Sequence, residues 1–420
     1  MTKTERPGLV WESGLFSPSP AWECEPSLAI ISKVVQETLG FSSDECSVSF
    51  LDAGAINRAY TVQVKDEKNK YIMRVSLPLD SKNKTASEVA THKWLRSTSI
   101  PVPEIIAFDD SNKNPIGYEW ILMQYIPGQC LYNRLRKIPW EDKIALVKKV
   151  ADCQLELMKS TFKGIGSLRE TEAGIVPGHC VAQEFIVGDC FDYDVPRGPF
   201  SSSRGWAKAR ADIAIHDHTA NIKKAEDDED DEYDEDDLED LEAHLHAAER
   251  LAETTPLVFP EESECTVLRH MDLSLCNMMV DENNQFCGII DWEFALAVPL
   301  WAAAEIPKFL EGNQCDEKPD PDNYGPPEPD AEGKDGLDDE GKSSNYWEQL
   351  MDYETTQLRK VYKDYMGKRQ YPSDIHENGA VKNDFIQAID DCSIGFNIRR
   401  TEGWLDEIEK GNFVRFKKDG

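Results

Sequence analysis

The sequence predicts an α+β protein with two lobes: an N-terminal antiparallel sheet with one helix, and a mainly helical C-terminal lobe. Between residues 47 and 127, short runs of Val, Ile, Phe and Tyr alternate with turns, which is typical of strands. After Pro139, apolar residues recur every three or four positions, which is typical of helices. We therefore expect an N-terminal extension over residues 1–46, a first lobe over 47–127 and a second lobe over 128–420.

The composition limits the classes of partner. The chain has 420 residues, of which 79 are acidic and 46 are Lys or Arg, so its formal net charge is −33. This charge argues against a protein that grips nucleic acid or an anionic membrane through a basic surface. No apolar run approaches the roughly 20 residues that span a bilayer, and the 11 cysteines are scattered without metal-site spacing. We therefore expect a cytoplasmic protein with reduced thiols that binds neither nucleic acid nor membrane.

The first lobe begins with three strand-like runs in residues 47–78, "SVSFLDAGAINRAYTVQVKDEKNKYIMRVSLP". A glycine-containing turn and a polar turn separate these runs, which predicts a three-stranded antiparallel meander. Residues 85–99, "TASEVATHKWLRSTS", have helical spacing, and residues 100–110 and 117–128 return to strand composition. The expected order is three strands, one helix and two further strands.

The second lobe is expected to open with an amphipathic helix over about residues 140–160. Residues 176–206 are rich in Gly and Pro, which predicts an irregular connection. The apolar segment 294–310, "FALAVPLWAAAEIPKFL", is expected to form core and a helix. Helical spacing returns over residues 345–368, and residues 402–416 predict a short terminal helix.

Two segments are strongly acidic. Residues 225–242 form an acidic insertion in which 14 of the 17 residues from Glu226 onward are Asp or Glu. Mutual repulsion favours a solvated insertion over a cation site, because no alternating ligand spacing resembles a calcium loop. Contact with a basic protein partner is the alternative role. Residues 315–342 are acidic and rich in Pro and Gly, which predicts a long loop.

The strongest chemical signal lies in residues 268–293, "LRHMDLSLCNMMVDENNQFCGIIDWE". His270, Asp272 and Asn277 have the His-x-Asp-x-x-x-x-Asn spacing of a kinase catalytic loop. Two strand-like runs follow around a polar turn, and a hairpin there would bring Asn277 close to Asp291. One amide oxygen and one carboxylate leave positions for phosphate oxygens and water, which suits Mg²⁺.

In this arrangement Asp272 would orient an acceptor hydroxyl or amine and take its proton, while His270 would hold the loop by hydrogen bonds. The alternative is a polar turn followed by a strand-ending aspartate, since three fixed residues recur by chance in long chains. The adjoining hairpin and the preceding sheet lobe favour the kinase-like interpretation.

Three segments resemble the aminoglycoside phosphotransferase family of the protein-kinase-like superfamily, especially its uncharacterised fungal members. They are "YIMRVSLP", "VLRHMDLSLCNMMVD" and "CGIIDWEFALAVPLW", and the resemblance extends over about residues 47–310. It implies a two-lobed protein-kinase-like fold and ATP or GTP as the phosphate donor. It also implies that Asp272 is the catalytic base and that Asn277 and Asp291 hold Mg²⁺.

The resemblance also assigns the nucleotide side of the site. The turn at Gly54 would let backbone N–H groups approach phosphates, although an ordinary hairpin turn has the same letters. Arg74 would replace the phosphate-contacting lysine of protein kinases, with Glu88 as its ion-pair partner; an edge-strand arginine with a surface glutamate is the alternative. Backbone groups of Gln124 to Ile126 would hydrogen-bond the base, with Met123 nearby, whereas a buried core strand would have the same composition.

The activity implied is a Mg²⁺-dependent transfer of the ATP γ-phosphate to a hydroxyl or amine of a small molecule. The chain lacks Gly-x-Gly-x-x-Gly, Val-Ala-Ile-Lys and an Ala-Pro-Glu after Asp291, which makes a protein kinase the weaker interpretation. A catalytically inactive nucleotide-binding scaffold is the other alternative. The presence of Asp272, Asn277 and Asp291 together argues against it.

Four residues near this motif have a second interpretation as acceptor-binding groups. Glu293 and Glu305 could line a pocket for a cationic acceptor, but in a chain this acidic we expect them on solvated surface. Trp292 and Trp301 could stack on a cation, but burial in the core is the commoner fate of tryptophan.

Overall fold

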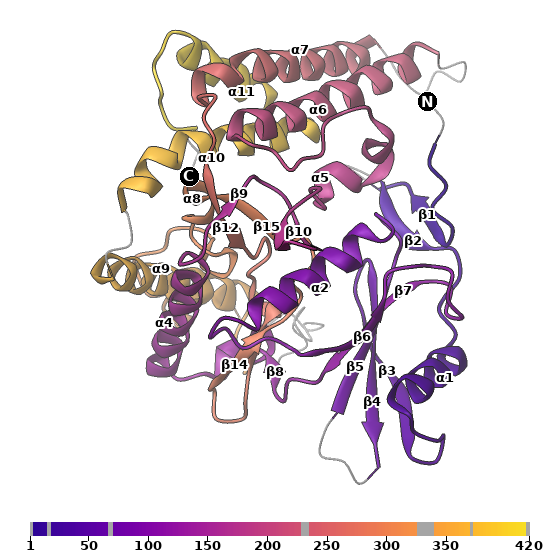
Figure 1. The fold of residues 1–420 in the computed structure, drawn as a ribbon. Coiled ribbons are helices and arrows are strands. Elements are labelled where there is room, and N and C mark those ends of the chain that lie inside the picture. The colour runs from indigo at the N-terminus through magenta and orange to yellow at the C-terminus, as the bar shows by residue number, and fades with distance from the viewer. Residues whose placement is uncertain are drawn as a thin grey trace.

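The structure is a computed structural model, and it confirms the α+β class with two lobes (Figure 1). A five-stranded antiparallel sheet with its helices forms the N-terminal lobe, and helices dominate the C-terminal lobe. The residues that the structure describes are 3–14, 18–65, 70–227, 235–325, 340–369 and 373–416.

The N-terminal sheet has the strand order β3-β4-β5-β7-β6, and all neighbours are antiparallel. Its first three strands confirm the predicted meander. Since β5 pairs with β4 on one side and β7 on the other, it is a central strand. The strands are β3 (Cys46–Ala53), β4 (Asn57–Val64), β5 (Lys70–Ser76), β6 (Ile105–Asp109) and β7 (Glu119–Gln124).

Helices cover both faces of this sheet. The predicted helix is present as α2 (Asn83–Leu95), whose Val89 packs with Ile121 and Met123 on one face. On the other face, α1 (Leu28–Leu39) buries Ile31 in a cluster with Met73 of β5. A small hairpin of β1 (Leu9–Glu12) and β2 (Ser19–Trp22) adds Leu9 and Trp22 to that cluster. The hairpin β1–β2 and helix α1 therefore pack on the sheet of the first lobe.

The C-terminal lobe contains three predicted helices and three that the sequence pattern did not reveal. The helices α4 (Trp140–Leu157), α9 (Ser344–Lys368) and α11 (Ile398–Glu409) were expected. The unforeseen helices are α6 (Ser203–Glu226), α7 (Glu235–Val258) and α10 (Ser373–Ser393), which lie together with α11 at one end of the lobe (Figure 1). Within the described residues, no helix has the length and apolar character that a membrane crossing requires.

The predicted acidic insertion is partly helical. Of residues 225–242, the first two end α6, and those from Glu235 onward form the first turns of α7. Long helices tolerate acidic residues on a solvated face when their other residues are buried, as Ala247, Ala248 and Leu251 of α7 are. Residues 228–234 of the insertion and residues 326–339 of the predicted 315–342 loop lie outside the described residues.

Short strands and turns connect the two lobes and shape the middle of the molecule. The segment 294–310 forms core and a helix, α8 (Leu300–Ala303), as expected. Before this helix it also forms a buried strand that was not predicted, β15 (Leu296–Pro299), paired with β12 (Cys265–Arg269). A short apolar run does not distinguish a buried strand from a helix, which explains why the strand was missed. The other short elements are β8 (Gln129–Cys130), α3 (Leu131–Arg134), η1 (Leu135–Lys137), β9 (Phe162–Lys163), β10 (Leu168–Thr171), β11 (Gly174–Pro177), α5 (Gln183–Ile186), η2 (Gly188–Asp192), η3 (Leu275–Asn277), β13 (Met278–Val280), β14 (Phe286–Ile289), η4 (Lys308–Leu310) and η5 (Pro321–Asn323).

Gly128, between the two lobes, is a position where the fold requires glycine. Its φ is +144°, and a Cβ added there would lie 2.5 Å from the carbonyl oxygen of Val280 in β13. We expect Gly128→Ala to lower the free energy of unfolding, measured with urea, by about 3 kcal/mol through backbone strain and overpacking. Gly174→Ala is the matched control, because Gly174 has a φ of +112° but open space around its Cβ position. Equal losses in the two variants would contradict the steric argument.

Candidate active site

The loop after β12 is held in place by His270. Its Nε2–H donates to the carbonyl oxygen of Ile290 at 3.1 Å, and its Nδ1 accepts from the backbone N–H of Asp272 at 3.2 Å. The ring also meets the Trp292 ring edge-on, with centroids 4.7 Å apart. These contacts support the structural role that the sequence suggested for His270, and they aim the Asp272 side chain away from the core.

The burial of His270 predicts a pH dependence of stability. Burial lowers the pKa of His270 to about 4, from an ordinary value of 6.5. The unfolded chain therefore binds a proton more readily than the folded one, and stability falls as the pH drops from about 6.5 towards 4. Between pH 7 and pH 4 we expect wild type to lose about 3 kcal/mol more free energy of unfolding than His270→Gln. Parallel pH profiles of the two proteins in urea unfolding would disprove this.

Asp272 lies at the surface of the loop with both carboxylate oxygens engaged. Its Oδ1 is 2.9 Å from Nζ of Lys308, and its Oδ2 accepts from Nδ2 of Asn277 at 2.9 Å. The same Asn277 nitrogen donates to the Asp272 carbonyl oxygen at 2.8 Å. The amide nitrogen of Asn277 is thus used within the loop, which orients the amide and leaves its Oδ1 as the atom able to bind a cation.

The predicted hairpin brings Asn277 and Asp291 together. Strands β13 and β14 pair in antiparallel fashion, and the N–H of Ile290 donates to the carbonyl oxygen of Asn277 at 2.9 Å. Asp291 follows directly, with a φ of +60°, a left-handed conformation that aspartate tolerates better than most residues. The polar turn and the strand register therefore bring the backbone of Asn277 next to Ile290, the residue that precedes Asp291.

Arg74 connects the two lobes at this point. Its Nη1 lies 3.2 Å from Oδ1 of Asp291, and its Nη2 contacts Oε2 of Glu88. Arg74 is 8% exposed and Glu88 is 1% exposed, and β5 is a central strand. The alternative of an edge-strand arginine with a surface glutamate is therefore wrong. Burial acts to lower the pKa of Arg74, but Glu88, Glu293 and Asp291 raise it above its ordinary value.

The residues present fit a magnesium ion bound together with nucleotide. Burial and the neighbouring Glu293 raise the pKa of Asp291, so an added cation would stabilise its carboxylate. Among the described residues, no group of three or more His, Cys, Asp or Glu could hold a metal by itself. A site built from Asn277 and Asp291 needs phosphate oxygens and water to complete six oxygen ligands, as is usual for Mg²⁺.

Glu293 is buried, so the expectation that it lies on solvated surface is wrong. Its Oε2 is 2.7 Å from Nζ of Lys84, and both of its oxygens accept from Nδ2 of Asn57 at 3.0 Å. Lys84 is 1% exposed and comes from α2, while Asn57 comes from β4. Glu293 therefore holds elements of the first lobe next to the Asp291 site. The sequence offered no local signal for this pairing, because its members lie far apart in the chain.

The turn and hinge predicted to bind nucleotide are present in the expected places. The N–H of Gly54 donates to the carbonyl oxygen of Asn57 at 3.0 Å in the turn between β3 and β4. The N–H groups of Gln124 and Tyr125 already donate to the carbonyl oxygens of Glu104 and Lys70. None of the described residues accepts a hydrogen bond from the N–H of Ile126. Among the N–H groups of the predicted base-binding segment, this one therefore remains available to a nucleotide base.

Met123, the residue predicted near the base, is largely buried. It is 8% exposed and packs with Val89 and Ile121 between the sheet and α2. The two tryptophans considered as cation-stacking groups, Trp292 and Trp301, are 1% and 6% exposed. Both tryptophans are core residues, as expected.

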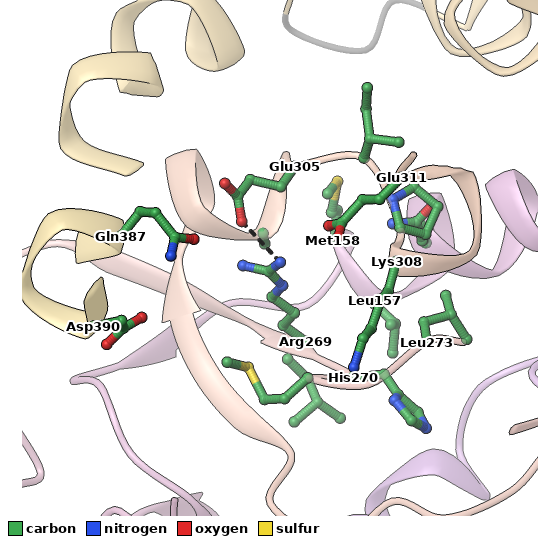
Figure 2. Close-up of a pocket in the computed structure, with 16 residues that line it drawn as sticks. Leu157, Met158, Arg269, His270, Leu273, Glu305, Lys308, Glu311, Gln387 and Asp390 are labelled. Atoms are coloured by element: carbon green, nitrogen blue, oxygen red, sulfur yellow. Dashed lines mark ion pairs between the residues drawn. The ribbon is translucent and has the colours of Figure 1, made fainter. Parts of the chain in front are cut away.

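A pocket of about 400 Å³ opens beside the Asp272 loop (Figure 2). Glu305 lines it, where its Oε2 pairs with Nη2 of Arg269 at 2.8 Å. Lys308 also lines it, and its ammonium end points towards the side of the pocket where His270 lies (Figure 2). The volume suits a small molecule. The lining residues are Gln154, Leu157, Met158, Leu268, Arg269, His270, Met271, Leu273, Ala303, Glu305, Ile306, Pro307, Lys308, Glu311, Gln387 and Asp390.

Comparison with known proteins identifies the family of this chain. The model of the phosphotransferase enzyme family, APH, matches residues 47–302, which include every predicted site residue. The chain belongs to this family. The resemblance drawn from the sequence motifs is thereby confirmed, and so is the kinase-like, two-lobed fold that it implied.

The relatives and solved structures similar to this phosphotransferase-family chain are distant. A subtelomeric hrmA-associated cluster protein of Aspergillus fumigatus is 24% identical over an alignment of 314 positions, and the match covers 63% of this chain and 61% of that protein. The chain therefore spans less than two thirds of that relative. Altered inheritance of mitochondria protein 9 of Yarrowia lipolytica is 31% identical over 133 residues, 29% of this chain and 23% of that protein.

Two solved structures can be aligned with most of the chain. The crystal structure of aminoglycoside phosphotransferase APH(4)-Ia has a TM-score of 0.44 and 13% identity, covering 91% of this chain and 99% of that one. The ethanolamine kinase of Plasmodium vivax has a TM-score of 0.43 and 14% identity, covering 95% of this chain and 86% of that one.

Proposed function

We propose that this protein is a small-molecule kinase that transfers the γ-phosphoryl group of ATP to a hydroxyl or amine. The observation that carries the proposal is the meeting of the Asp272 loop, the Asn277–Asp291 hairpin and the Arg74–Glu88 pair at one place between the lobes. Membership of the phosphotransferase enzyme family supports the reaction class.

Each residue has a distinct task in the proposed reaction. Asp272 orients the acceptor group and takes its proton as the bond to phosphorus forms. Arg74 and the backbone of the Gly54 turn position the phosphates, and Glu88 holds Arg74 in place. Mg²⁺, bound through Asn277 and Asp291, would neutralise charge on the phosphate oxygens.

The pocket beside Asp272 supports a small acceptor over a protein substrate. Its volume of about 400 Å³ is that of a metabolite site, and polar groups such as Glu305 and Gln387 converge on it. An acceptor with several hydroxyl or amino groups would find hydrogen-bond partners there. ATP is the proposed donor, and GTP is the alternative to be compared with it.

A screen of nucleotide turnover tests the proposal. Purified protein is supplied with MgATP or MgGTP and a library of amino-alcohols, sugars and hydroxylated metabolites, and nucleoside diphosphate release is measured. The blank is Asp291→Ala, which should lose Mg²⁺-dependent nucleotide binding. We expect release that depends on one class of acceptor and on Mg²⁺. Equal release by wild type and the blank would overturn the proposal.

A further inference from the structure

Lys308 contacts the carboxylate of Asp272 although it lies 36 residues further along the chain. Its Nζ is 2.9 Å from Oδ1 of Asp272, and the two side chains are 60% and 51% exposed. The ammonium group therefore lies beside the carboxylate that the acceptor must approach, and Lys308 is one of the residues that line the neighbouring pocket. Neither the kinase-type motif nor the hairpin accounts for a cation at this position.

The backbone that carries Lys308 is fixed against the catalytic loop. The N–H of Phe309 donates to the carbonyl oxygen of Leu273 at 3.1 Å, which ties η4 directly to the loop. On the other side, Nε of Arg359 donates to the carbonyl oxygen of Leu310 at 2.9 Å, and the Leu310 side chain is fully buried. Hydrogen bonds thus tie the backbone around Lys308 to the loop that carries Asp272, while the Lys308 side chain itself is mostly exposed.

We propose that Lys308 is a catalytic cation that moves from Asp272 to the transferred phosphoryl group during the reaction; this inference rests on the proposed function. In the resting protein, Asp272 is the counter-ion of Lys308. When Asp272 accepts the proton of the acceptor, its carboxylate becomes neutral and no longer attracts the ammonium group. In the transition state the transferred phosphoryl group has its negative charge spread over three equatorial oxygens, which the ammonium group can then contact.

The distances make this exchange of partners short. An acceptor oxygen within about 3 Å of Asp272 lies about 3–3.5 Å from the attacked phosphorus. An ammonium group 2.9 Å from the same carboxylate is therefore near the reacting atoms, and the flexible stem of lysine can direct it to the phosphoryl oxygens. Lysine suits this role, because its charge is compact, its stem is flexible and it has three donors.

The step is balanced without a further reactant. The bond between the acceptor oxygen and the γ-phosphorus forms, and the bond between that phosphorus and the β–γ bridging oxygen breaks. ADP leaves with the electron pair of the broken bond, and the acceptor proton resides on Asp272. Lys308 keeps its proton throughout and only changes the anion that it contacts.

An exposed ion pair without function would look similar, and the chain provides a matched example. Lys360 lies 2.8 Å from Asp316, and these side chains are 57% and 61% exposed. Lys360 belongs to α9 and does not line the pocket. Pairs of this kind contribute little to stability, so both lysines can be replaced without loss of the fold.

The first test compares Lys308→Met, Lys308→Arg and Lys360→Met in MgATP turnover, with water or an acceptor from the screen. We expect Lys308→Met to lower kcat about 100-fold with little change in the KM for ATP, which is the effect of removing one donor to a developing anion. Lys308→Arg should recover most of the activity, because it keeps a cation, and Lys360→Met should equal wild type.

The second test measures binding without turnover, using MgADP with fluoroaluminate as a mimic of the transferred phosphoryl group. Lys308→Met should bind this mimic about 100-fold more weakly, while binding of MgADP alone stays unchanged. If wild type turns over ATP and binds the mimic, and Lys308→Met does both equally well, the role of Lys308 is overturned but the proposed function is not. Wild type that neither turns over nor binds nucleotide would overturn the proposed function and this role with it.

Discussion

Replacing Asp272 with asparagine is expected to lower kcat about 1000-fold while leaving the Kd for MgATP nearly unchanged. Asparagine has the same shape and can still accept the hydrogen bond from Asn277, so the loop should keep its structure. It cannot take the acceptor proton, and loss of a general base typically costs 10²–10⁴ in rate. Single-turnover kinetics and calorimetric titration with a non-hydrolysable ATP analogue measure the two quantities.

The control for this substitution is Asp316→Asn. Asp316 also pairs with a half-exposed lysine, at 2.8 Å, but it lies outside the pocket. We expect this variant to keep wild-type kcat. If Asp272→Asn retained kcat within a few-fold of the control, Asp272 would not be the base. The role proposed for Lys308, which depends on that assignment, would then also be wrong.

Removing the carboxylate of Glu88 is expected to destabilise the protein more than any surface substitution. Glu88→Ala leaves the buried guanidinium of Arg74 without its closest counter-ion. Breaking a buried pair on one side typically costs about 3–5 kcal/mol, because the remaining charge stays desolvated. Urea unfolding of Glu88→Ala should therefore show a lower midpoint with a similar slope.

Two further variants separate this effect from a general loss of contacts. Glu170→Ala removes the exposed partner of Lys93 and should cost less than about 1 kcal/mol. The double variant Glu88→Ala with Arg74→Met removes both charges. We expect its loss of unfolding free energy to be smaller than the sum of the losses in the two single variants. Strict additivity would show that Arg74 and Glu88 do not depend on each other. Glu88→Ala and the double variant should also bind MgATP weakly, since Arg74 is proposed to position phosphates, whereas Glu170→Ala should bind it as wild type does.

The parts of the site that lie close together in the chain were predictable from the sequence. His270, Asp272 and Asn277 lie in one loop. The two strands that follow, β13 and β14, form a hairpin whose register is set by its turn. Local geometry therefore suffices to place Asn277 beside Asp291. The composition of the first lobe likewise predicted three paired strands, because runs rich in Val, Ile, Phe and Tyr are separated there by short turns.

The long helices α6, α7 and α10 were missed for a physical reason. Much of the buried surface of α6 and α7 consists of alanines such as Ala207, Ala211, Ala247 and Ala248, which lets the two helices approach closely. Alanine carries a weak hydrophobic signal, and the acidic residues around it suggest a solvated segment. The strand β15 was missed because a buried strand and a buried helix have the same apolar composition.

The sequence by itself determined the fold class, the family and the identity of the loop and hairpin that carry Asp272, Asn277 and Asp291. Only the tertiary structure decided that Glu293 is buried against Lys84 and Asn57, and that Lys308 reaches the carboxylate of Asp272. The difference is one of range. Periodicity and motif spacing report contacts between residues that are near neighbours in the chain. Glu293 meets Lys84, and Lys308 meets Asp272, because elements far apart in the chain pack together. Packing selects such partners by shape and burial and not by their distance in the sequence.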